Sequence, residues 1–495
     1  MSLARNLAAD VFRPAPLQVD PELLRTELVA AAHWVADYLE ALPGEPVTTP
    51  MPEQHRHRLA ADTLSETGAP LASLRAFVQR DVAPYPCGNG HPRFFGWITS
   101  PPSPVGIVAE LLATAINANC GAGEHALVDI ERGVIATLAR LAGMPAGTGG
   151  VLTSGGSMAN LLCLAAARAW AVERFGLGGR DVDADHDAVH SRLTCYCSAQ
   201  AHMCIGKAAK LIGLAPARLR RVPTAAGGGL DPGALSRMVR ADLRAGLRPF
   251  CAVSTLGTTG TGAVDPIEAV AEVCRRHDMW HHADGAYGGL GALVAELAPH
   301  YTAMHRLDSL AVDGHKTLQV PIDCGGALAT DPRRLRAAFA EHPSYLDTDP
   351  ASDRPWLSEL SVELTRPGGR ALKLWATLHT LGRRGVVELL ERHQRLAGLL
   401  RELIAAHPDL VPVPSGPHPV VCFRYRGLDD TQHRELVRRL QRDGRVFLGG
   451  VDTGSGTALR ACVCNFRTTE TDVAFLVDEV ATVGRAVLSE ETCYA

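Results

Sequence analysis

Short apolar runs that alternate with helical patterns are the feature of this sequence that most constrains its fold. The runs are Gly149–Thr153, Leu193–Ser198, Phe250–Leu256, Trp280–Asp284 and Ser309–Val312. Stretches with helical spacing of apolar residues lie between them, such as Ser157–Arg174 and Pro266–His277. Strands that alternate with helices build βαβ units, so this pattern predicts an α/β fold with a mostly parallel central sheet.

The length of the chain predicts more than one domain, because 495 residues are too many for one simple core. We expect a helical N-terminal segment over 1–104, a large α/β domain over 105–374 and a small α+β domain over 375–495. The first segment should hold helices over 20–42 and 68–80. The last should hold a long helix, short strands and a final helix.

Composition excludes several classes of protein. A net charge of −4 without a basic stripe argues against a nucleic-acid partner. No apolar run reaches the roughly 18 residues of a membrane span, and the N-terminus lacks the apolar part of a signal peptide. The 13 cysteines are scattered without a C-x-x-C pair, so we expect reduced thiols and a cytoplasmic protein. The pairs His281/His282 and His55/His57 lack a third ligand, so we expect no metal site.

Lysine is scarce in this chain. Lysine and arginine total 49, but the only lysines are Lys207, Lys210, Lys316 and Lys373. Because arginine does not lose its proton in a protein, a lysine in such a chain indicates a need for amine chemistry. Lys316 comes just after an apolar run and follows His315. The plain alternative is a solvated surface lysine.

Three further polar features follow predicted strands. The turn Ser154–Ser157 lies between a strand and a helix, where free backbone N–H groups bind phosphate. Asp284 ends one apolar run, and His202 comes just after another. Each has an alternative as a turn or capping residue. Since the carboxyl ends of parallel strands meet at one crevice, we expect these groups to lie beside Lys316.

This set of groups is the one that pyridoxal 5′-phosphate (PLP) requires. A lysine forms the imine, and an acid keeps the pyridine nitrogen protonated. A glycine turn holds the phosphate, and a flat side chain stacks on the ring. The sequence therefore predicts PLP as cofactor.

The chain resembles the group II PLP-dependent decarboxylases from about residue 20 to its C-terminus. The motifs that carry the resemblance are His91-Pro-Arg-Phe-Phe95, Thr153-Ser-Gly-Gly-Ser157, Gln200-Ala-His202, Ser254-Thr-Leu-Gly-Thr-Thr259, His282-Ala-Asp-Gly-Ala-Tyr287, His315-Lys316 and Ser344-Tyr345-Leu346. The resemblance implies the PLP-dependent transferase fold of type I. It also implies a homodimer with its active site at the interface, in which the N-terminal segment takes part in dimerisation.

The same resemblance implies a role for each matched residue. Lys316 is the Schiff-base lysine, Asp284 pairs with the pyridinium nitrogen, and His202 stacks on the ring. Tyr345 helps to protonate the substrate carbon after carbon dioxide leaves. The remaining cofactor-binding residues are Ala286 on the second ring face, Thr259 near the ring, and Gly155, Gly156, Ser157 and His315 around the phosphate.

The implied activity is decarboxylation of an L-amino acid to the amine, through an internal aldimine on Lys316 and a quinonoid intermediate. Phe94, Phe95 and Trp97 favour an aromatic or large apolar substrate. Two departures from the family pattern leave the substrate open. Thr317 stands where the family usually has an aromatic residue, and 117–125 contains none of the aromatics that line the pocket of aromatic-acid decarboxylases.

Two other functions remain as alternatives. Some relatives couple decarboxylation to oxidative deamination and release an aldehyde, but these often replace the loop tyrosine, and here Tyr345 is present. A catalytically dead scaffold of the same fold is the second alternative. The presence of Lys316, Asp284 and His202 together argues against it.

Overall fold

A computed structural model describes residues 17–61, 64, 66–176, 191–344, 352–454 and 456–492. The chain divides into two compact units, Met1–Gly88 and Asn89–Ala495, which are described separately. The expected domain boundaries at 104 and 374 stay a prediction.

The first unit consists of helices. Pro21 starts the first helix, and the carboxylate of Asp20 caps it by accepting the backbone N–H groups of Glu22 and Leu23. The helix expected over 20–42 is thus confirmed. The helices of this unit are α2 (Pro21–Ala41), α3 (Glu53–Ala61) and α4 (Ala72–Phe77), and α4 continues into a π-helical turn (Val78–Val82).

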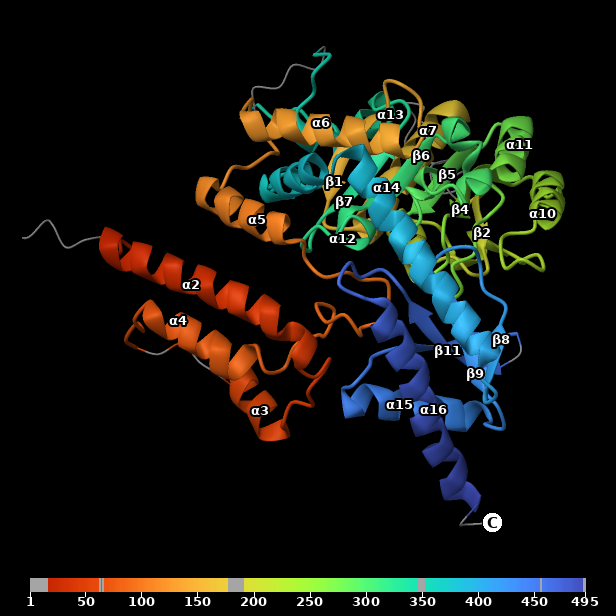
Figure 1. Ribbon diagram of the computed structural model, residues 1–495. Helices are drawn as coiled ribbons and strands as arrows, with labels where there is room; N and C mark the ends of the chain where they lie inside the picture. Colours follow the sequence, from red (N-terminus) through yellow and green to blue (C-terminus); the bar gives the residue numbers. More distant parts are fainter. Residues whose placement is uncertain are drawn as a thin grey trace, which may run out of the picture. The chain divides into compact units, whose positions relative to one another are not determined.

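The second unit is built on a seven-stranded sheet (Figure 1). The strand order is β1-β7-β6-β5-β4-β2-β3, in which β7 runs antiparallel to both neighbours and the other strands run parallel. The strands are β1 (Gly149–Thr153), β2 (Leu193–Ser198), β3 (Leu219–Val222), β4 (Arg248–Thr255), β5 (Trp280–Gly285), β6 (Ser309–Asp313) and β7 (Gly325–Ala329). The prediction of a mostly parallel sheet is confirmed.

Helices cover both faces of this sheet, so neighbouring residues of a strand can enter different cores. In β6, Ala311 packs with the residues of α7, whereas Leu310 and Val312 pack with those of α6 and α14. A strand buried on both faces is apolar throughout, which is why these strands stand out in the sequence. The helices are α5 (Pro104–Ile116), α6 (Ala126–Leu141), α7 (Gly156–Arg174), α9 (Met203–Leu211), α10 (Pro232–Arg244), α11 (Ile267–His277), α12 (Gly314–Thr317), α13 (Arg333–Phe339) and α14 (Gly369–Ala406).

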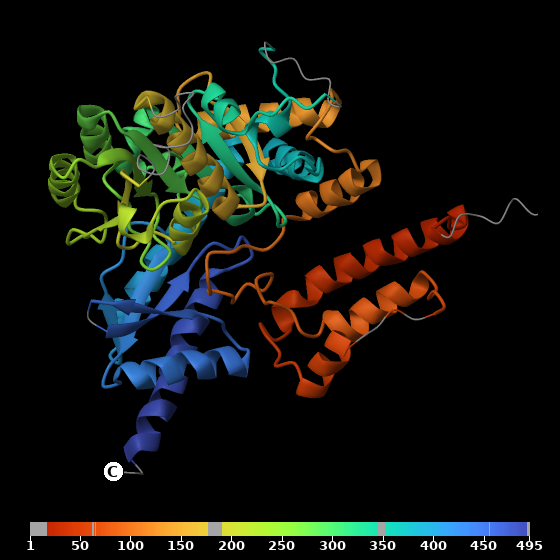
Figure 2. The same cartoon turned by 180° about the vertical axis from the view of Figure 1, so that it is seen from behind.

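The C-terminal part of the second unit is a four-stranded antiparallel sheet with helices beside it, as Figure 2 shows from behind. Its order is β10-β11-β9-β8. The elements are β8 (Leu410–Val413), β9 (Val420–Tyr425), α15 (Asp430–Asp443), β10 (Gly449–Thr453), β11 (Gly456–Cys462) and α16 (Glu470–Thr492). The long helix α14 leads into this sheet. It is interrupted at Gly382, whose φ of +59° favours glycine.

No described helix combines the length and the apolar composition that a membrane span needs. Among the described residues, no group of histidine, cysteine and acidic side chains has the arrangement of a metal site.

Four fully buried histidines make the fold sensitive to acid. Burial lowers the pKa of His281, His282, His393 and His418 to about 3. In the unfolded chain histidine titrates near 6.5, so below that pH the unfolded state takes up protons that the folded state does not. The stabilisation is complete above pH 6.5 and is lost as the pH falls, at about 1.4 kcal/mol per pH unit for each histidine.

We therefore expect the free energy of unfolding to fall between pH 7 and pH 5.5, and a His393→Gln variant to lose about 1.4 kcal/mol less than the wild type. Within the part of the chain that the structure describes, the Nε2 atom of His393 has no hydrogen-bond partner, so its removal breaks no hydrogen bond of that atom there. Urea unfolding at the two pH values measures both losses. If the free energy of unfolding falls by the same amount in wild type and variant, His393 does not stay neutral in the folded protein.

Candidate active site

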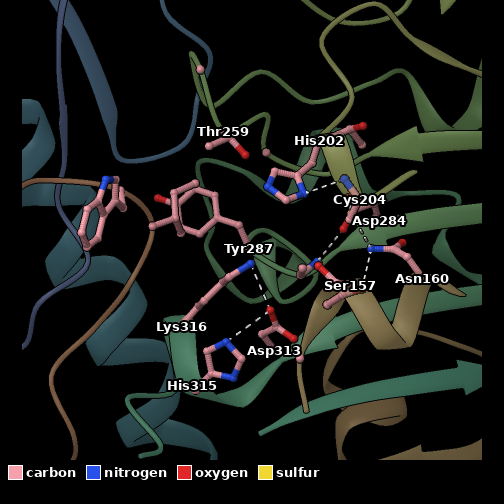
Figure 3. Close-up of a pocket in the computed structure, with 18 of the residues that line it drawn as sticks. Ser157, Asn160, His202, Cys204, Thr259, Asp284, Tyr287, Asp313, His315 and Lys316 are labelled. Carbon is pink, nitrogen blue, oxygen red and sulfur yellow. Dashed lines mark hydrogen bonds and ion pairs between the residues drawn. The ribbon is translucent and has the colours of Figure 1, made fainter. Parts of the chain in front are cut away.

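A cavity of about 790 Å³ opens at the carboxyl ends of the parallel strands (Figure 3). This volume suits a small-molecule ligand. Most of the residues expected from the sequence line it, namely Gly155, Gly156, Ser157, His202, Thr259, Asp284, Ala286, His315, Lys316 and Trp97. The structure therefore brings together groups that lie on six separate parts of the chain.

Two expected residues lie elsewhere. Phe94 is buried and stacks on Phe447, and Phe95 belongs to the core of the C-terminal sheet. Neither is among the described residues that line the cavity. Tyr345 lies outside the described residues.

The glycine turn between β1 and α7 has little room for side chains. A Cβ atom on Gly155 would lie 3.1 Å from His315 Cε1, and one on Gly156 would lie 2.7 Å from the Ala286 Cβ. Gly155 also has a φ of +147° and supplies no side-chain cap to α7. The first N–H groups of α7 thus face the cavity without a capping side chain, which is the environment that a phosphate group needs.

Lys316 projects into the same cavity from α12, directly after β6. Its Nζ atom lies 3.0 Å from Oδ2 of Asp313, a carboxylate that is almost fully buried, and His315 Nε2 lies 3.6 Å from the same oxygen. Burial lowers the pKa of Lys316, but Asp313 and Asp284 outweigh it, and the pKa is raised. Without a bound ligand, Lys316 is therefore a charged ammonium group held by Asp313.

Asp284 and His202 face Lys316 across the cavity. Asp284 is the second-last residue of β5, and its Oδ1 atom accepts the N–H of Ala286 at 3.3 Å. His202 caps α9, with Nδ1 accepting the N–H of Cys204 at 3.3 Å. Burial lowers the pKa of His202, so its ring is neutral near pH 7 and carries its proton on Nε2.

Arg460 is a site residue that the sequence did not reveal. It comes from β11 in the C-terminal sheet, lines the cavity and is 5% exposed. Its Nη1 atom donates to the carbonyl oxygen of Trp97 at 3.0 Å, while its Nε and Nη2 atoms are buried and have no partner among the described residues. An arginine has no distinctive signal in a chain so rich in arginine. A buried guanidinium with unpaired donors beside a cavity is ready to bind an anion.

Asp313 and Asn160 were also missed. Asp313 lies three residues before Lys316, on the same strand end, so its position relative to the lysine was a usable signal. Asn160 lies inside the predicted helix after the glycine turn, and nothing in its sequence context distinguishes it.

A mostly parallel sheet that carries a lysine, an acid and a glycine turn at its strand ends defines a PLP-dependent enzyme of fold type I. Residues 52–426 match the model of the pyridoxal-dependent decarboxylase conserved domain. The chain belongs to the pyridoxal-dependent decarboxylase family and is a PLP-dependent amino-acid decarboxylase. The resemblance to group II decarboxylases and the expected cofactor are thus confirmed.

Known proteins similar to this chain over nearly its full length include decarboxylases of aromatic amino acids. Tryptophan decarboxylase 1 of Oryza sativa subsp. japonica is 30% identical, and the match covers 90% of each chain. The aromatic-L-amino-acid decarboxylase of Bacillus atrophaeus is 27% identical over 97% of this chain and 99% of the relative.

Solved structures agree with this grouping. The crystal structure of Oryza sativa TDC with PLP and tryptamine superposes with a TM-score of 0.89 at 27% identity, over 96% of this chain and 99% of that one. That of Rhodiola rosea 4-hydroxyphenylacetaldehyde synthase gives a TM-score of 0.84 at 27% identity, over 95% and 99%.

Proposed function

We propose that this enzyme decarboxylates an aromatic or large apolar L-amino acid to the corresponding amine and carbon dioxide. The observation that carries this proposal is one cavity lined by both Lys316 and Arg460, whose guanidinium has two donors without a partner among the described residues. When bound, PLP supplies a ring that accepts the electron pair left on the substrate Cα as carbon dioxide departs.

The residues around Lys316 fit this cofactor, and we assign them as follows. Lys316 Nζ supplies the amine that holds the cofactor, and Asp284 keeps a proton on the ring nitrogen. The neutral ring of His202 packs on one face and Ala286 on the other. The other cofactor contacts are assigned to Thr259 beside the ring and to Gly155, Gly156, Ser157 and His315 around the phosphate.

We assign Arg460 to the α-carboxylate of the substrate. Its Nε and Nη2 donors are buried and lack a partner among the described residues, so a carboxylate that reaches them would form two charge-assisted hydrogen bonds. Holding that carboxylate in place would fix the orientation of the substrate Cα beside the bound cofactor. The guanidinium therefore orients the bond that breaks.

The substrate preference rests on the apolar side chains of the cavity and on the relatives. Trp97, Ile98, Met158, Tyr287 and Val451 line the cavity and offer apolar surface to a substrate side chain. Burial of an aromatic ring on such surface contributes a few kcal/mol at about 25 cal/mol per Å². The relatives named above act on tryptophan or on aromatic amino acids.

A homodimer with the active site at its interface is part of the proposal. Helix α5 leaves large apolar side chains more than half exposed, namely Val108, Leu111, Leu112 and Ile116. A contiguous apolar face of this kind is typical of a protein–protein interface. We also keep the prediction of a cytoplasmic protein, on the basis of its scattered cysteines.

Formation of an aldehyde is the second candidate reaction, because 4-hydroxyphenylacetaldehyde synthase of Rhodiola rosea is 27% identical to this chain. Tyr345 favours the amine, since a proton donor at the substrate carbon ends the lifetime of the carbanion. Its role stays a prediction.

A substrate panel tests the proposed function. We expect the highest kcat/KM on phenylalanine, tyrosine, tryptophan or leucine, with amine and carbon dioxide in equal amounts and little aldehyde or peroxide. Glutamate and diaminobutyrate serve as comparison substrates of opposite side-chain charge. Highest kcat/KM on either of these would overturn the substrate class, and aldehyde with peroxide as the main products would overturn the reaction.

A further inference from the structure

Asn160 joins two parts of the proposed cofactor site that are far apart in the sequence. It lies one turn into α7, is fully buried and lines the cavity. Its Nδ2 atom donates to the carbonyl oxygen of Gly156 at 2.7 Å and to the sulfur of Cys204 at 3.5 Å. Its Oδ1 atom accepts from His282 Nε2 at 2.7 Å. All hydrogen-bonding atoms of this amide therefore have partners.

The partners of the amide determine its orientation, because the carbonyl oxygen of Gly156, 2.7 Å away, can only accept and therefore faces Nδ2. Trp280 Nε1 can only donate, and it donates to Ser309 Oγ at 2.8 Å. Since Nδ2 of Asn160 faces Gly156, its Oδ1 atom faces His282 Nε2, which must donate, and the Nδ1 atom of the same ring then accepts from Ser309 Oγ at 2.9 Å. Burial lowers the pKa of His282 to about 3, so the ring is neutral and carries one proton, on Nε2. The hydrogen bonds from Trp280 to Asn160 thus form one buried chain, in which this proton is donated to Oδ1.

The hydrogen bond from Asn160 to Gly156 orients a peptide group of the phosphate turn. The carbonyl of Gly156 and the N–H of Ser157 belong to the same planar peptide group and point in opposite directions. A hydrogen bond that holds the carbonyl oxygen therefore also sets the direction of the Ser157 N–H, one of the free groups at the start of α7.

The contact of Asn160 with Cys204 connects it to the carboxylate of Asp284. Burial, together with the charge of Asp284, raises the pKa of Cys204 to about 12, so the thiol keeps its proton. Its sulfur lies 4.0 Å from Asp284 Oδ2 and donates to it, while Oδ1 is held by Ala286 N. The amide of Asn160 thus determines where the thiol lies, and the thiol contacts the oxygen of Asp284 that Ala286 leaves free (Figure 3).

We propose that Asn160 is a positioning residue that holds the phosphate-binding turn and the ring-nitrogen carboxylate in one fixed geometry. This inference rests on the proposed cofactor roles of Ser157 and Asp284. It gives the buried chain from Trp280 to Asn160 a function that packing alone does not require, because apolar residues would fill the same space without fixing any direction.

The test compares the affinity of the cofactor-free full-length protein for PLP and for pyridoxal, which has no phosphate. Asn160→Asp keeps the size of the side chain and the acceptor for His282, but replaces the donor to Gly156 by an oxygen. We expect PLP binding to weaken at least tenfold and pyridoxal binding less than threefold. The visible absorbance of the lysine-bound cofactor gives both dissociation constants.

Asn465→Asp is the matched control. Asn465 is also buried in the second unit, and its Nδ2 donates to a backbone carbonyl, that of His91, at 2.8 Å, but it does not line the cavity. The Asn465→Asp variant should lower thermal stability as much as Asn160→Asp, but it should leave the ratio of PLP affinity to pyridoxal affinity unchanged. If Asn160→Asp does not fold, Asn160→Ala is measured in the same way.

Cys204 provides a second, separate readout. Cys204→Ala should shift the pH at which the absorbance of the lysine-bound cofactor changes, and Cys204→Ser, which keeps a donor to Asp284, should restore it. An unchanged ratio of PLP to pyridoxal affinity in both Asn160 variants would overturn the inference while the cofactor site stands. Equal affinity of the wild type for PLP and pyridoxal would instead overturn the proposed phosphate turn itself.

Discussion

Lys316→Ala is expected to lower kcat at least about a thousandfold and to abolish the visible absorbance of the bound cofactor. The cavity contains no second lysine that could take over the imine, because Lys316 is the only lysine among the described residues that line it. Lys316→Arg should fail as well, since a guanidinium keeps its proton and does not attack an aldehyde. Absorbance spectra and carbon dioxide release measure both effects.

Lys210→Ala is the control for this prediction. Lys210 is an exposed lysine in the last turn of α9, so its removal alters the charge of the protein but no group of the cavity. It should retain wild-type absorbance and turnover. A Lys316→Ala variant that still released carbon dioxide at a similar rate would remove Lys316 from the mechanism.

Arg460→Ala should lower kcat/KM by about a hundredfold, because loss of one partner of a buried charge pair costs about 3 kcal/mol. The cofactor absorbance should remain, since Arg460 is assigned to the substrate. Arg460→Lys should recover part of the loss, because it restores the charge but not the paired donors. Steady-state kinetics on the substrate panel, with absorbance as a check on cofactor content, test these outcomes.

The panel also separates two roles for Arg460. If Arg460→Ala lowers kcat/KM on every substrate, Arg460 binds the α-carboxylate, which all of the substrates share. If the variant lowers kcat/KM on glutamate alone, Arg460 instead binds the side-chain carboxylate of the substrate. Arg438→Ala, an exposed arginine on α15, is the control, and equal kinetics for Arg460→Ala and Arg438→Ala would contradict the assignment.

The strands of the large sheet were predicted well where they are apolar on both faces. Gly149–Thr153 and Leu193–Ser198 coincide with β1 and β2, and Ser309–Val312 extends by one residue into β6. The strand β7 was not predicted. Four of its five residues are glycine or alanine, and a Cβ on Gly325 would lie 2.5 Å from the Cα of Gly155. A strand of small residues gives a weak apolar signal.

The aromatic motif near residue 94 shows the limit of reading a pocket from composition. Phe94, Phe95 and Trp97 were grouped because they are neighbours in the sequence. In the structure Phe94 and Phe95 are buried beside the C-terminal sheet, and of the three only Trp97 lines the cavity. Aromatic residues that are close in the chain can point in different directions, and the sequence does not say which direction each takes.

The sequence by itself determined the fold class, the cofactor and the lysine, acid, histidine and glycine turn that follow its strands. These are local properties, since a polar residue at the end of a buried parallel strand faces the crevice in any sheet of this kind. Only the tertiary structure decided that Arg460 is an unpaired charge in that crevice and that Asn160 connects Gly156 to Cys204. Desolvation and hydrogen-bond partners depend on which distant segments pack together, and local sequence does not encode that packing.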